Sequence, residues 1–297
     1  MLRRLVQSER DLRLSIDRRI LSSRNEVEVK RMWLASLYLQ ARSHAQRRAV
    51  RSGLWNADGL HVIMCLTLEP GDVFFDVGAN VGWVTQPAAW LVGRRGVVHS
   101  FEPSSTTCCY LRRRLVCMGL TNVVVNEFAL GAVSGSATLY EWAENFGGSS
   151  SLRRGVPPGQ HLLAETQVAV KVLDDYVEEN SIRHVRLIKM DVEGSEIDVL
   201  RGARRLLTAS NRPMLFVEVN QTVNAAFGRS VNDLINELIG LGYNLFSWRE
   251  TGLVSVKSER DIPASGHDDV ICLSPGIHDA LHNQLERLAR HPGFRVA

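Results

Sequence analysis

Glycines and a carboxylate gather where one apolar run of this sequence ends. The stretch "DVFFDVGANVG" carries Asp76 at the end of its apolar residues, and Gly78, Asn80 and Gly82 follow with the spacing G-x-N-x-G. Glycine permits the positive φ angles of a tight turn. A carboxylate and an asparagine at such a turn suit a ligand with a positive amine and a carboxylate better than a diphosphate. We therefore interpret Asp76, Gly78, Asn80 and Gly82 as candidate ligand-binding residues.

A second carboxylate follows the next apolar run. Glu102 lies 26 residues after Asp76, where a carboxylate can accept both hydroxyls of a ribose. S-adenosylmethionine meets both requirements, with an amino-acid end for the glycine turn and a ribose for Glu102. Phe128, after the third apolar run, is a candidate to stack on the adenine, and a place in the core is the alternative.

Three more carboxylates come after later apolar runs. Asp191 and Glu193 follow residues 185–190, and Glu218 ends residues 214–219. Oxygen ligands suit a divalent cation such as Mg²⁺, and a carboxylate can also serve as a general base. These residues are predicted to be catalytic, either by binding a cation through Asp191 and Glu218 or by taking a proton directly. For Glu193, a charge at the N-terminus of a following helix is a second interpretation.

Two histidines and one loop have weaker signals. His267 lies near carboxylates before the last apolar run and could accept a proton at neutral pH. The start of a parallel strand faces away from the ligand edge, so a surface turn is the favoured interpretation. His99, inside the second run, is predicted to be a hydrogen-bonded core residue. The Gly/Ser-rich residues 144–155 are predicted either to cover the substrate as a lid or to form a plain surface insertion.

The elements that must position these residues are short apolar runs separated by helical stretches. Such runs are buried on both faces, which is typical of a doubly wound, mostly parallel α/β sheet of Rossmann-like class. In such a sheet, ligands bind beyond the carboxyl ends of the strands. The seven predicted strands are residues 73–77, 97–101, 123–125, 185–190, 214–219, 243–246 and 270–273.

The remaining pattern predicts helices and one excursion from the sheet. The helical stretches are about 85–93, 104–119, 194–207 and 230–241. Residues 131–172 interrupt the rhythm with "SATLYEW" and "TQVAVKVL", which predicts an antiparallel pair. The chain is expected to divide into a helical, basic N-terminal extension (residues 1–56) and an α/β domain (residues 57–297).

Charge and composition limit the classes of protein. The 297 residues are 45% hydrophobic, which is ordinary for a globular protein. We find no apolar run of transmembrane length, no export signal and no zinc spacing among the five cysteines, so a cytoplasmic protein is expected. Residues 1–55 hold 13 basic and 5 acidic side chains. They could contact a membrane surface peripherally, or form a solvated helix packed by one face.

Seven segments follow one another within about residues 70–220: "DVGANVG", "VVHSFEPS", "NEFALGAVSG", "SSSL", "VKVLDDYV", "LIKMDVEGSEIDVLRGARRLL" and "PMLFVEVN". In these segments and their order, the sequence resembles the FkbM-type methyltransferases. The resemblance implies a class I S-adenosylmethionine-dependent fold and O-methylation of a hydroxyl on a sugar, glycolipid or polyketide-type secondary metabolite. It matches Asp76, Gly78, Asn80 and Gly82 to the cofactor turn, Glu102 to the ribose ligand, and Asp191, Glu193 and Gly194 to the motif after the fourth strand.

Two other functions remain as alternatives. A nicotinamide-dependent oxidoreductase is disfavoured because the third glycine of G-x-G-x-x-G is missing. A non-catalytic adaptor that keeps the fold is disfavoured by the intact glycine turn. The segment "DVEG" differs from the Asn/Asp-Pro-Pro-Tyr type of base-methylating enzymes, so no nucleic acid is expected as a partner. The expected partner is a small-molecule or glycan acceptor. Assembly into a homo-oligomer is a further possibility.

Overall fold

The computed structural model describes residues 67–142, 149–152, 162–226, 228–249 and 252–283, together with residues 60, 63 and 64. The predicted N-terminal extension, residues 1–56, lies outside the described residues, as does most of the predicted lid. Among the residues that are described, no helix has the length and apolar character needed to span a membrane.

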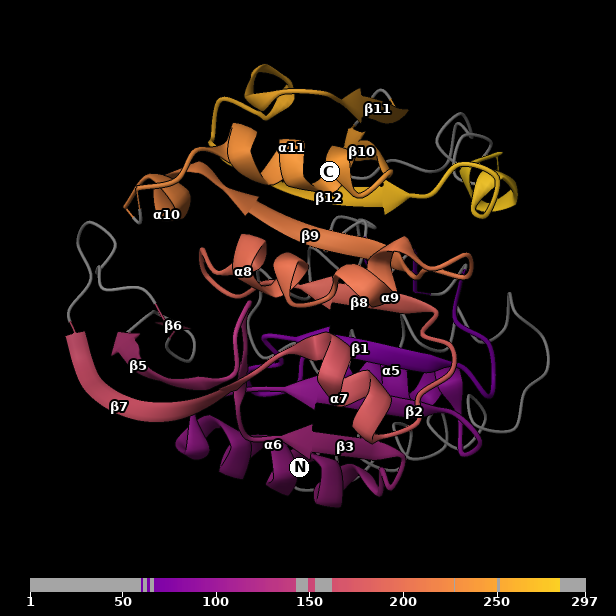
Figure 1. Cartoon of the computed structure of the whole chain (residues 1–297). Coiled ribbons are helices and arrows are strands. Elements are labelled where there is room, and N and C mark those ends of the chain that lie inside the picture. Colours follow the sequence, from indigo (N-terminus) through magenta and orange to yellow (C-terminus); the bar gives the residue numbers. More distant parts are fainter. Residues whose placement is uncertain are drawn as a thin grey trace, which may run out of the picture.

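One large sheet organises the molecule (Figure 1). Its eight strands have the order β11-β10-β12-β9-β8-β1-β2-β3. The five strands from β9 to β3 in this order are mutually parallel, whereas β12 runs antiparallel to β9 and β10. The strands are β1 (Val73–Val77), β2 (Val97–Phe101), β3 (Val123–Asn126), β8 (Leu187–Met190), β9 (Met214–Asn220), β10 (Asn244–Arg249), β11 (Gly252–Val256) and β12 (His267–Leu273).

All seven predicted strands are present, but the predicted count is one too low. The eighth strand, β11, pairs with β10 as an antiparallel edge strand. Val254 and Ser255 of this strand are exposed, Leu253 is partly buried and Val256 is buried, as expected at the edge of a sheet. It therefore lacks the continuous apolar run by which the other strands were predicted.

The helices flank the sheet (Figure 1). The predicted helix over 194–207 is divided at residues 202–203, where Gly202 passes so close to the chain at Gly131 that a Cβ atom would lie 2.1 Å from the Gly131 carbonyl oxygen. The helices are α5 (Thr85–Val92), α6 (Ser105–Met118), α7 (Leu173–Glu179), α8 (Glu196–Arg201), α9 (Arg204–Thr208), α10 (Gln221–Ala226) and α11 (Val231–Gly240), with a 3₁₀ turn at Glu259–Asp261.

Two hydrophobic cores lie on the two faces of the sheet. In β1, Phe75 belongs to the core shared with α7, α8, α9 and α11, whereas Phe74 belongs to the core shared with α5. This division follows from the alternation of side chains along a strand. Both phenylalanines are fully buried, and burying each contributes roughly 1.5–3 kcal/mol to stability. The buried strands thus form a rigid base for the residues at their ends.

The interrupted stretch forms a second, smaller sheet with the order β4-β7-β5-β6. Its strands are β4 (Ala129–Leu130), β5 (Gly135–Trp142), β6 (Ser149–Ser151) and β7 (Leu162–Lys171). Strands β5 and β7 are antiparallel, which confirms the predicted excursion. Figure 1 shows β5, β6 and β7 on the side of the main sheet where the chain leaves β9 for α10. This is the carboxyl-end edge of the parallel strands.

Candidate active site

A cavity lies at the carboxyl-end edge, between the two sheets. The main sheet contributes Gly78, Asn80, Glu102, Asp191, Glu193 and Ser195 to its lining. The second sheet contributes Leu139, Ser150 and Ser151, with Leu152 directly after β6. The cavity therefore joins two groups of residues that were predicted separately, the glycine turn with its ribose ligand and the acids after the fourth predicted strand.

The turn after β1 requires a glycine at its first position. Gly78 has a φ angle of 79°, and a Cβ atom there would lie 1.7 Å from the carbonyl oxygen of Asp191. The backbone N–H groups of Gly78 and Ala79 both donate to the carbonyl oxygen of Phe101 at 3.0 Å. The turn is thus fixed against β2 and against the chain after β8. Asn80 continues it in a left-handed conformation, with a φ angle of 47°.

Glu102 is buried beside this turn, with a relative exposure of 5%. Its carboxylate accepts hydrogen bonds from the backbone N–H groups of Asn80 at 3.0 Å and Ser104 at 2.9 Å. Burial raises the pKa of Glu102 to about 7, although these two hydrogen bonds oppose the shift. A carboxylate has about four acceptor positions, so Glu102 can still receive hydroxyl donors from the cavity.

Asp76 and Gly82, predicted as cofactor contacts, are not among the residues that line this cavity. Asp76 is fully buried, and its Oδ2 atom accepts a hydrogen bond of 2.6 Å from the Thr85 hydroxyl. Gly82 packs against α6, where a Cβ atom would lie 2.4 Å from Cδ1 of Leu111. Both residues shape the turn from behind, and their direct contact with a ligand stays a prediction.

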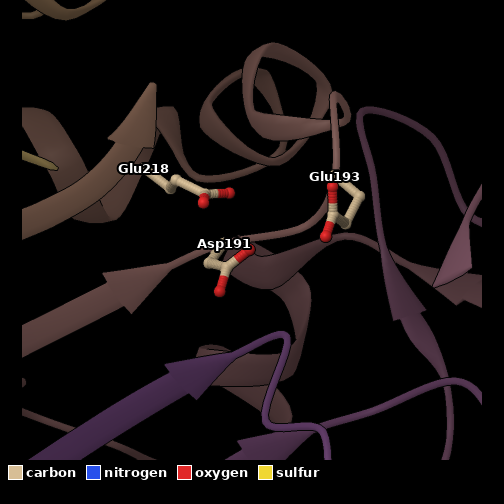
Figure 2. Close-up of side chains that lie close together, drawn as sticks. All are labelled: Asp191, Glu193 and Glu218. Carbon is tan, nitrogen blue, oxygen red and sulfur yellow. The ribbon is translucent and has the colours of Figure 1, made fainter. Parts of the chain in front are cut away.

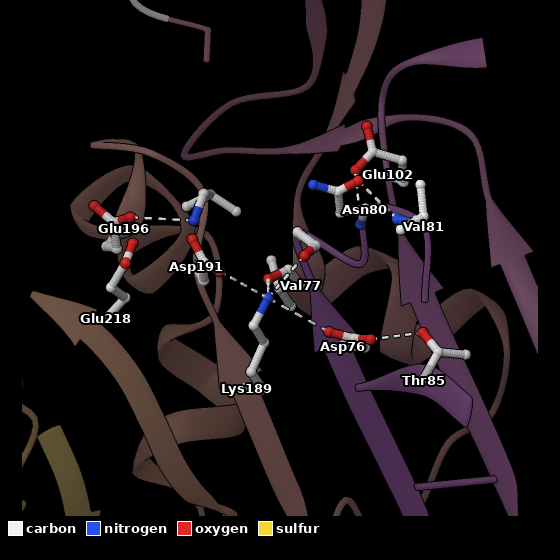
Figure 3. A network of polar contacts seen from close by, with 12 residues as sticks. Asp76, Val77, Asn80, Val81, Thr85, Glu102, Lys189, Asp191, Glu196 and Glu218 are labelled. Carbon is white, nitrogen blue, oxygen red and sulfur yellow. Dashed lines mark hydrogen bonds and ion pairs between the residues drawn. The ribbon is translucent and has the colours of Figure 1, made fainter. Parts of the chain in front are cut away.

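Lys189, which was not among the predicted site residues, lies between the carboxylates of Asp76 and Asp191 (Figure 3). Its ammonium is 3.2 Å from Oδ2 of Asp191 and 3.6 Å from Oδ1 of Asp76. Burial alone would lower the pKa of Lys189, but the carboxylates of Asp191 and Asp76 outweigh it, and the pKa is raised. The sequence did contain a sign of its role, because Lys189 is the one charged residue in "LIKM", an otherwise apolar strand that is buried throughout.

The three predicted acids are close together (Figure 2), which confirms their expected proximity. Asp191, Glu193 and Glu218 each offer an oxygen atom within 4.8 Å of the others. Burial acts to raise the pKa of Asp191, but the Lys189 ammonium outweighs it and the pKa is lowered. Burial and the charges of Asp191 and Glu193 raise the pKa of Glu218 well above its ordinary value. The environment therefore favours the ionised form of Asp191 and the protonated form of Glu218.

His267 is exposed, as expected, but the expectation that it faces away from this edge is wrong. Because β12 is antiparallel to β9, its first residues lie at the carboxyl end of β9, with His267 opposite Asn220. The Nε2 atom of His267 lies 2.7 Å from Oε1 of Glu218, while about half of the His267 side chain is exposed. His99 is a hydrogen-bonded core residue as predicted, with Nδ1 2.7 Å from the hydroxyl of Tyr176.

The backbone between β8 and α8 is held in an uncommon conformation. Glu193 has a φ angle of 50° and Gly194 one of 90°, and α8 begins only at Glu196. Glu193 therefore precedes the helix instead of lying in its first turn. The Glu196 carboxylate accepts from the N–H groups of Val192 and Gly194 at 3.2 Å, and burial raises its pKa to about 6. The Ser151 hydroxyl of β6 donates to the Glu193 carbonyl oxygen at 2.7 Å.

Phe128 packs against the core, which was one of its two interpretations, and stacking on an adenine stays a prediction. It lines the cavity and also packs against the larger core, where its ring lies 5.9 Å from that of Phe101 in an edge-to-face arrangement. The Lys171 ammonium lies 4.9 Å from the centre of the Phe128 ring. One face of the cavity is therefore aromatic.

Solved structures resemble the chain distantly. Fibrillarin from Aeropyrum pernix, in complex with natively bound S-adenosyl-L-methionine, is 13% identical, with 74% of this chain and 76% of that chain covered and a TM-score of 0.42. A SAM-dependent O-methyltransferase from Thermotoga maritima is 12% identical, with 73% and 65% covered and a TM-score of 0.40.

Sequence relationships are stronger. "Methyltransferase 1" of Beauveria bassiana is 31% identical over 153 residues, which are 45% of this chain and 59% of that protein. The match thus spans about three fifths of the relative's length. The model of the Methyltransferase FkbM domain matches residues 76–245, more than half of the 297 residues. The resemblance found in the sequence is confirmed, and the chain belongs to the methyltransferase FkbM domain family.

Proposed function

We propose that this protein is an S-adenosylmethionine-dependent O-methyltransferase that acts on a hydroxyl of a sugar, glycolipid or polyketide-type natural product. One observation carries the proposal. A single cavity joins the glycine turn and Glu102, which suit a nucleoside with an amino-acid tail, to Asp191 and Glu193, which suit the handling of a proton.

The residues of the cavity fit the methyl donor. Glu102 offers acceptor positions for two ribose hydroxyls, and the aromatic ring of Phe128 offers a surface for a base. The acidic lining also suits the positive charge of a sulfonium. When bound, S-adenosylmethionine supplies an electrophilic methyl group, and the protein's task is to align an oxygen atom with it.

The carboxylates at the cavity can accept the proton that an attacking hydroxyl must lose. We assign the role of proton acceptor to the Asp191–Glu218 pair. Because its environment raises the pKa of Glu218, the ionised form of this carboxylate is a stronger base than an ordinary glutamate. His267, in contact with Glu218 and half exposed, offers a route for the proton to solvent.

A divalent cation is the other role for the same acids. Oxygens of Asp191, Glu193 and Glu218 are the ligand type that Mg²⁺ prefers, and such an ion would lower the pKa of an acceptor hydroxyl. However, the ammonium of Lys189 already lies 3.2 Å from Asp191 and supplies a positive charge there. This proximity favours the direct base.

The second sheet is suited to the acceptor. It lines the cavity with leucine side chains and with hydroxyls, at Leu139, Ser150, Ser151 and Leu152. A wall that is both apolar and hydroxyl-bearing matches sugars and polyketides, which present carbon faces and hydroxyl edges. Residues 149–152 are the described part of the predicted lid, and the place of Ser150, Ser151 and Leu152 on the cavity supports a covering role.

The proposal is tested by transfer of labelled methyl groups. The purified full chain is incubated with methyl-labelled S-adenosylmethionine and fractions of glycolipids and secondary metabolites, beside an Asp191→Asn variant. We expect one product heavier by a CH₂ unit whose label survives mild alkali, as an ether does and a methyl ester does not. Label in a methyl ester or an amine, or equal transfer by the variant, would contradict the proposal.

A further inference from the structure

One buried hydroxyl at the cavity has no hydrogen-bond partner. Ser195 has a relative exposure of 3%, lines the cavity, and its Oγ atom is unpartnered within the described part of the chain. A buried hydroxyl without a partner is destabilising by about 1–3 kcal/mol. Although Ser195 directly precedes α8, its side chain makes no capping hydrogen bond to that helix.

The location of Ser195 ties it to the glycine turn. Its backbone N–H lies 3.4 Å from the carbonyl oxygen of Val192, and Val192 Cγ1 would lie 3.4 Å from a Cβ atom on Gly78. The same short segment holds Asp191, which touches the Gly78 turn through its carbonyl oxygen. A ligand held by the Gly78 turn is therefore adjacent to the segment that carries the unpartnered hydroxyl.

The amino-acid carboxylate of S-adenosylmethionine must accept hydrogen bonds from the protein when it is bound. Among its described residues, the cavity lining contains no arginine, lysine or histidine. Its side-chain donors are one asparagine and three serines, and the Ser151 hydroxyl already donates to the Glu193 carbonyl oxygen. Ser195 is the buried donor whose hydrogen bond is still unmade.

We propose that the Ser195 hydroxyl donates a hydrogen bond to the amino-acid carboxylate of the methyl donor. This inference rests on the proposed function. It assigns a polar contact to the tail of the donor, on the side of the cavity away from Glu102. It also supplies a partner for a buried hydroxyl that has none among the described residues.

Two probes isolate this contact. S-adenosylhomocysteine has the carboxylate, and its decarboxylated analogue, S-adenosyl-3-thiopropylamine, lacks it. For Ser195→Ala we expect the affinity for S-adenosylhomocysteine, measured by calorimetric titration, to fall at least about 10-fold, as for a lost hydrogen bond to a charged group. The affinity for the decarboxylated analogue is expected to stay within about 2-fold.

Thermal unfolding supplies a second measurement. Since the hydroxyl is unpartnered, Ser195→Ala without ligand is expected to have an unchanged or higher Tm. The matched control is Ser247→Ala, because Ser247 is equally buried but donates to Asp268 at 2.8 Å. That variant is expected to lose Tm and to keep its affinity for S-adenosylhomocysteine.

The outcomes separate this inference from the proposed function. If the wild-type protein does not bind S-adenosylhomocysteine, both fail. If it binds and Ser195→Ala binds equally well, or loses affinity equally for both probes, only the Ser195 contact is overturned. Should Ser195→Ala not fold, Ser195→Cys is titrated instead, and its weaker S–H donor is expected to produce the same selective loss.

Discussion

The ammonium of Lys189 donates a hydrogen bond of 2.7 Å to the carbonyl oxygen of Gly78, so a side chain of β8 holds the turn that follows β1. The same ammonium lies 3.2 Å from Asp191. One buried cation thereby couples the proposed donor-binding turn to the proposed proton acceptor (Figure 3). The position of each depends on the other.

Replacement of Lys189 by methionine should therefore damage both stability and binding. Asp76, fully buried, would lose the only cation that the described residues place beside it. Removing one partner of a buried ion pair typically lowers the free energy of unfolding by about 3–5 kcal/mol. Urea unfolding measures this loss, and titration with S-adenosylhomocysteine should show weaker binding.

The control for Lys189→Met is Arg112→Met. Arg112 pairs with Glu127 at 2.7 Å, but both side chains are exposed. Such a pair contributes about 0–1 kcal/mol. Equal stability of Lys189→Met and the wild-type protein would show that the buried network is not coupled as described.

The raised pKa of Glu102 leads to a prediction of how pH affects stability and binding. Its pKa is raised to about 7 by burial, so the folded state binds the proton more tightly than the unfolded chain. The free energy of unfolding should then decrease as pH rises from about 4.5 to about 7. A ribose donates to the ionised carboxylate, so the affinity for S-adenosylhomocysteine should increase from about pH 6 to about pH 8. Calorimetry in buffers of different ionisation enthalpy would detect proton release.

The matched variant is Glu102→Gln, which keeps the shape and loses the titration. Glu196 titrates in a similar range, with a pKa of about 6, so the variant separates the two groups. We expect weaker binding and a flatter pH profile for Glu102→Gln. A profile as steep as that of the wild-type protein would assign the pH dependence to another group.

Glu218→Gln should lower turnover without removing the donor. General-base catalysis typically contributes 10²–10⁴-fold, so kcat should fall by roughly two orders of magnitude or more, while the affinity for S-adenosylhomocysteine changes less than about 3-fold. The reaction is followed with the acceptor identified by labelling. Glu127→Gln, which alters an exposed acid, is the control. Unchanged turnover in Glu218→Gln would exclude Glu218 from proton transfer.

Chelation distinguishes the base from a cation. With Lys189 already beside Asp191, we expect methylation by the purified protein to be unchanged after treatment with EDTA. Turnover before and after treatment, with Mg²⁺ added back, measures this. Loss of activity that Mg²⁺ restores would instead assign Asp191, Glu193 and Glu218 to metal binding.

The sequence was sufficient to place residues that lie at the ends of neighbouring parallel strands. Asp191 follows β8 and Glu218 lies near the end of β9, and the ends of parallel strands meet at one edge, so their proximity could be predicted. His267 could not be placed in this way, because its position depends on the reversed direction of β12. Strand direction is a non-local property that the apolar run in 270–273 does not encode.

Two further residues required coordinates for different reasons. Lys189 was visible as a charge inside a buried strand, but its partners come from β1 and from the turn after it. Ser195 has no sequence signal, because an unpartnered hydroxyl is defined by what surrounds it. The edge strand β11 was missed because Ser255 interrupts its apolar residues and most of the strand is not buried.

The most direct test of the central claim is a crystal structure of the protein with S-adenosylhomocysteine. We predict the nucleoside in the cavity between the main sheet and β6, with its ribose hydroxyls about 3 Å from the Glu102 carboxylate and its sulfur atom on the side of Asp191. A nucleoside bound elsewhere on the protein, or one in this cavity with its ribose turned away from Glu102, would contradict the account.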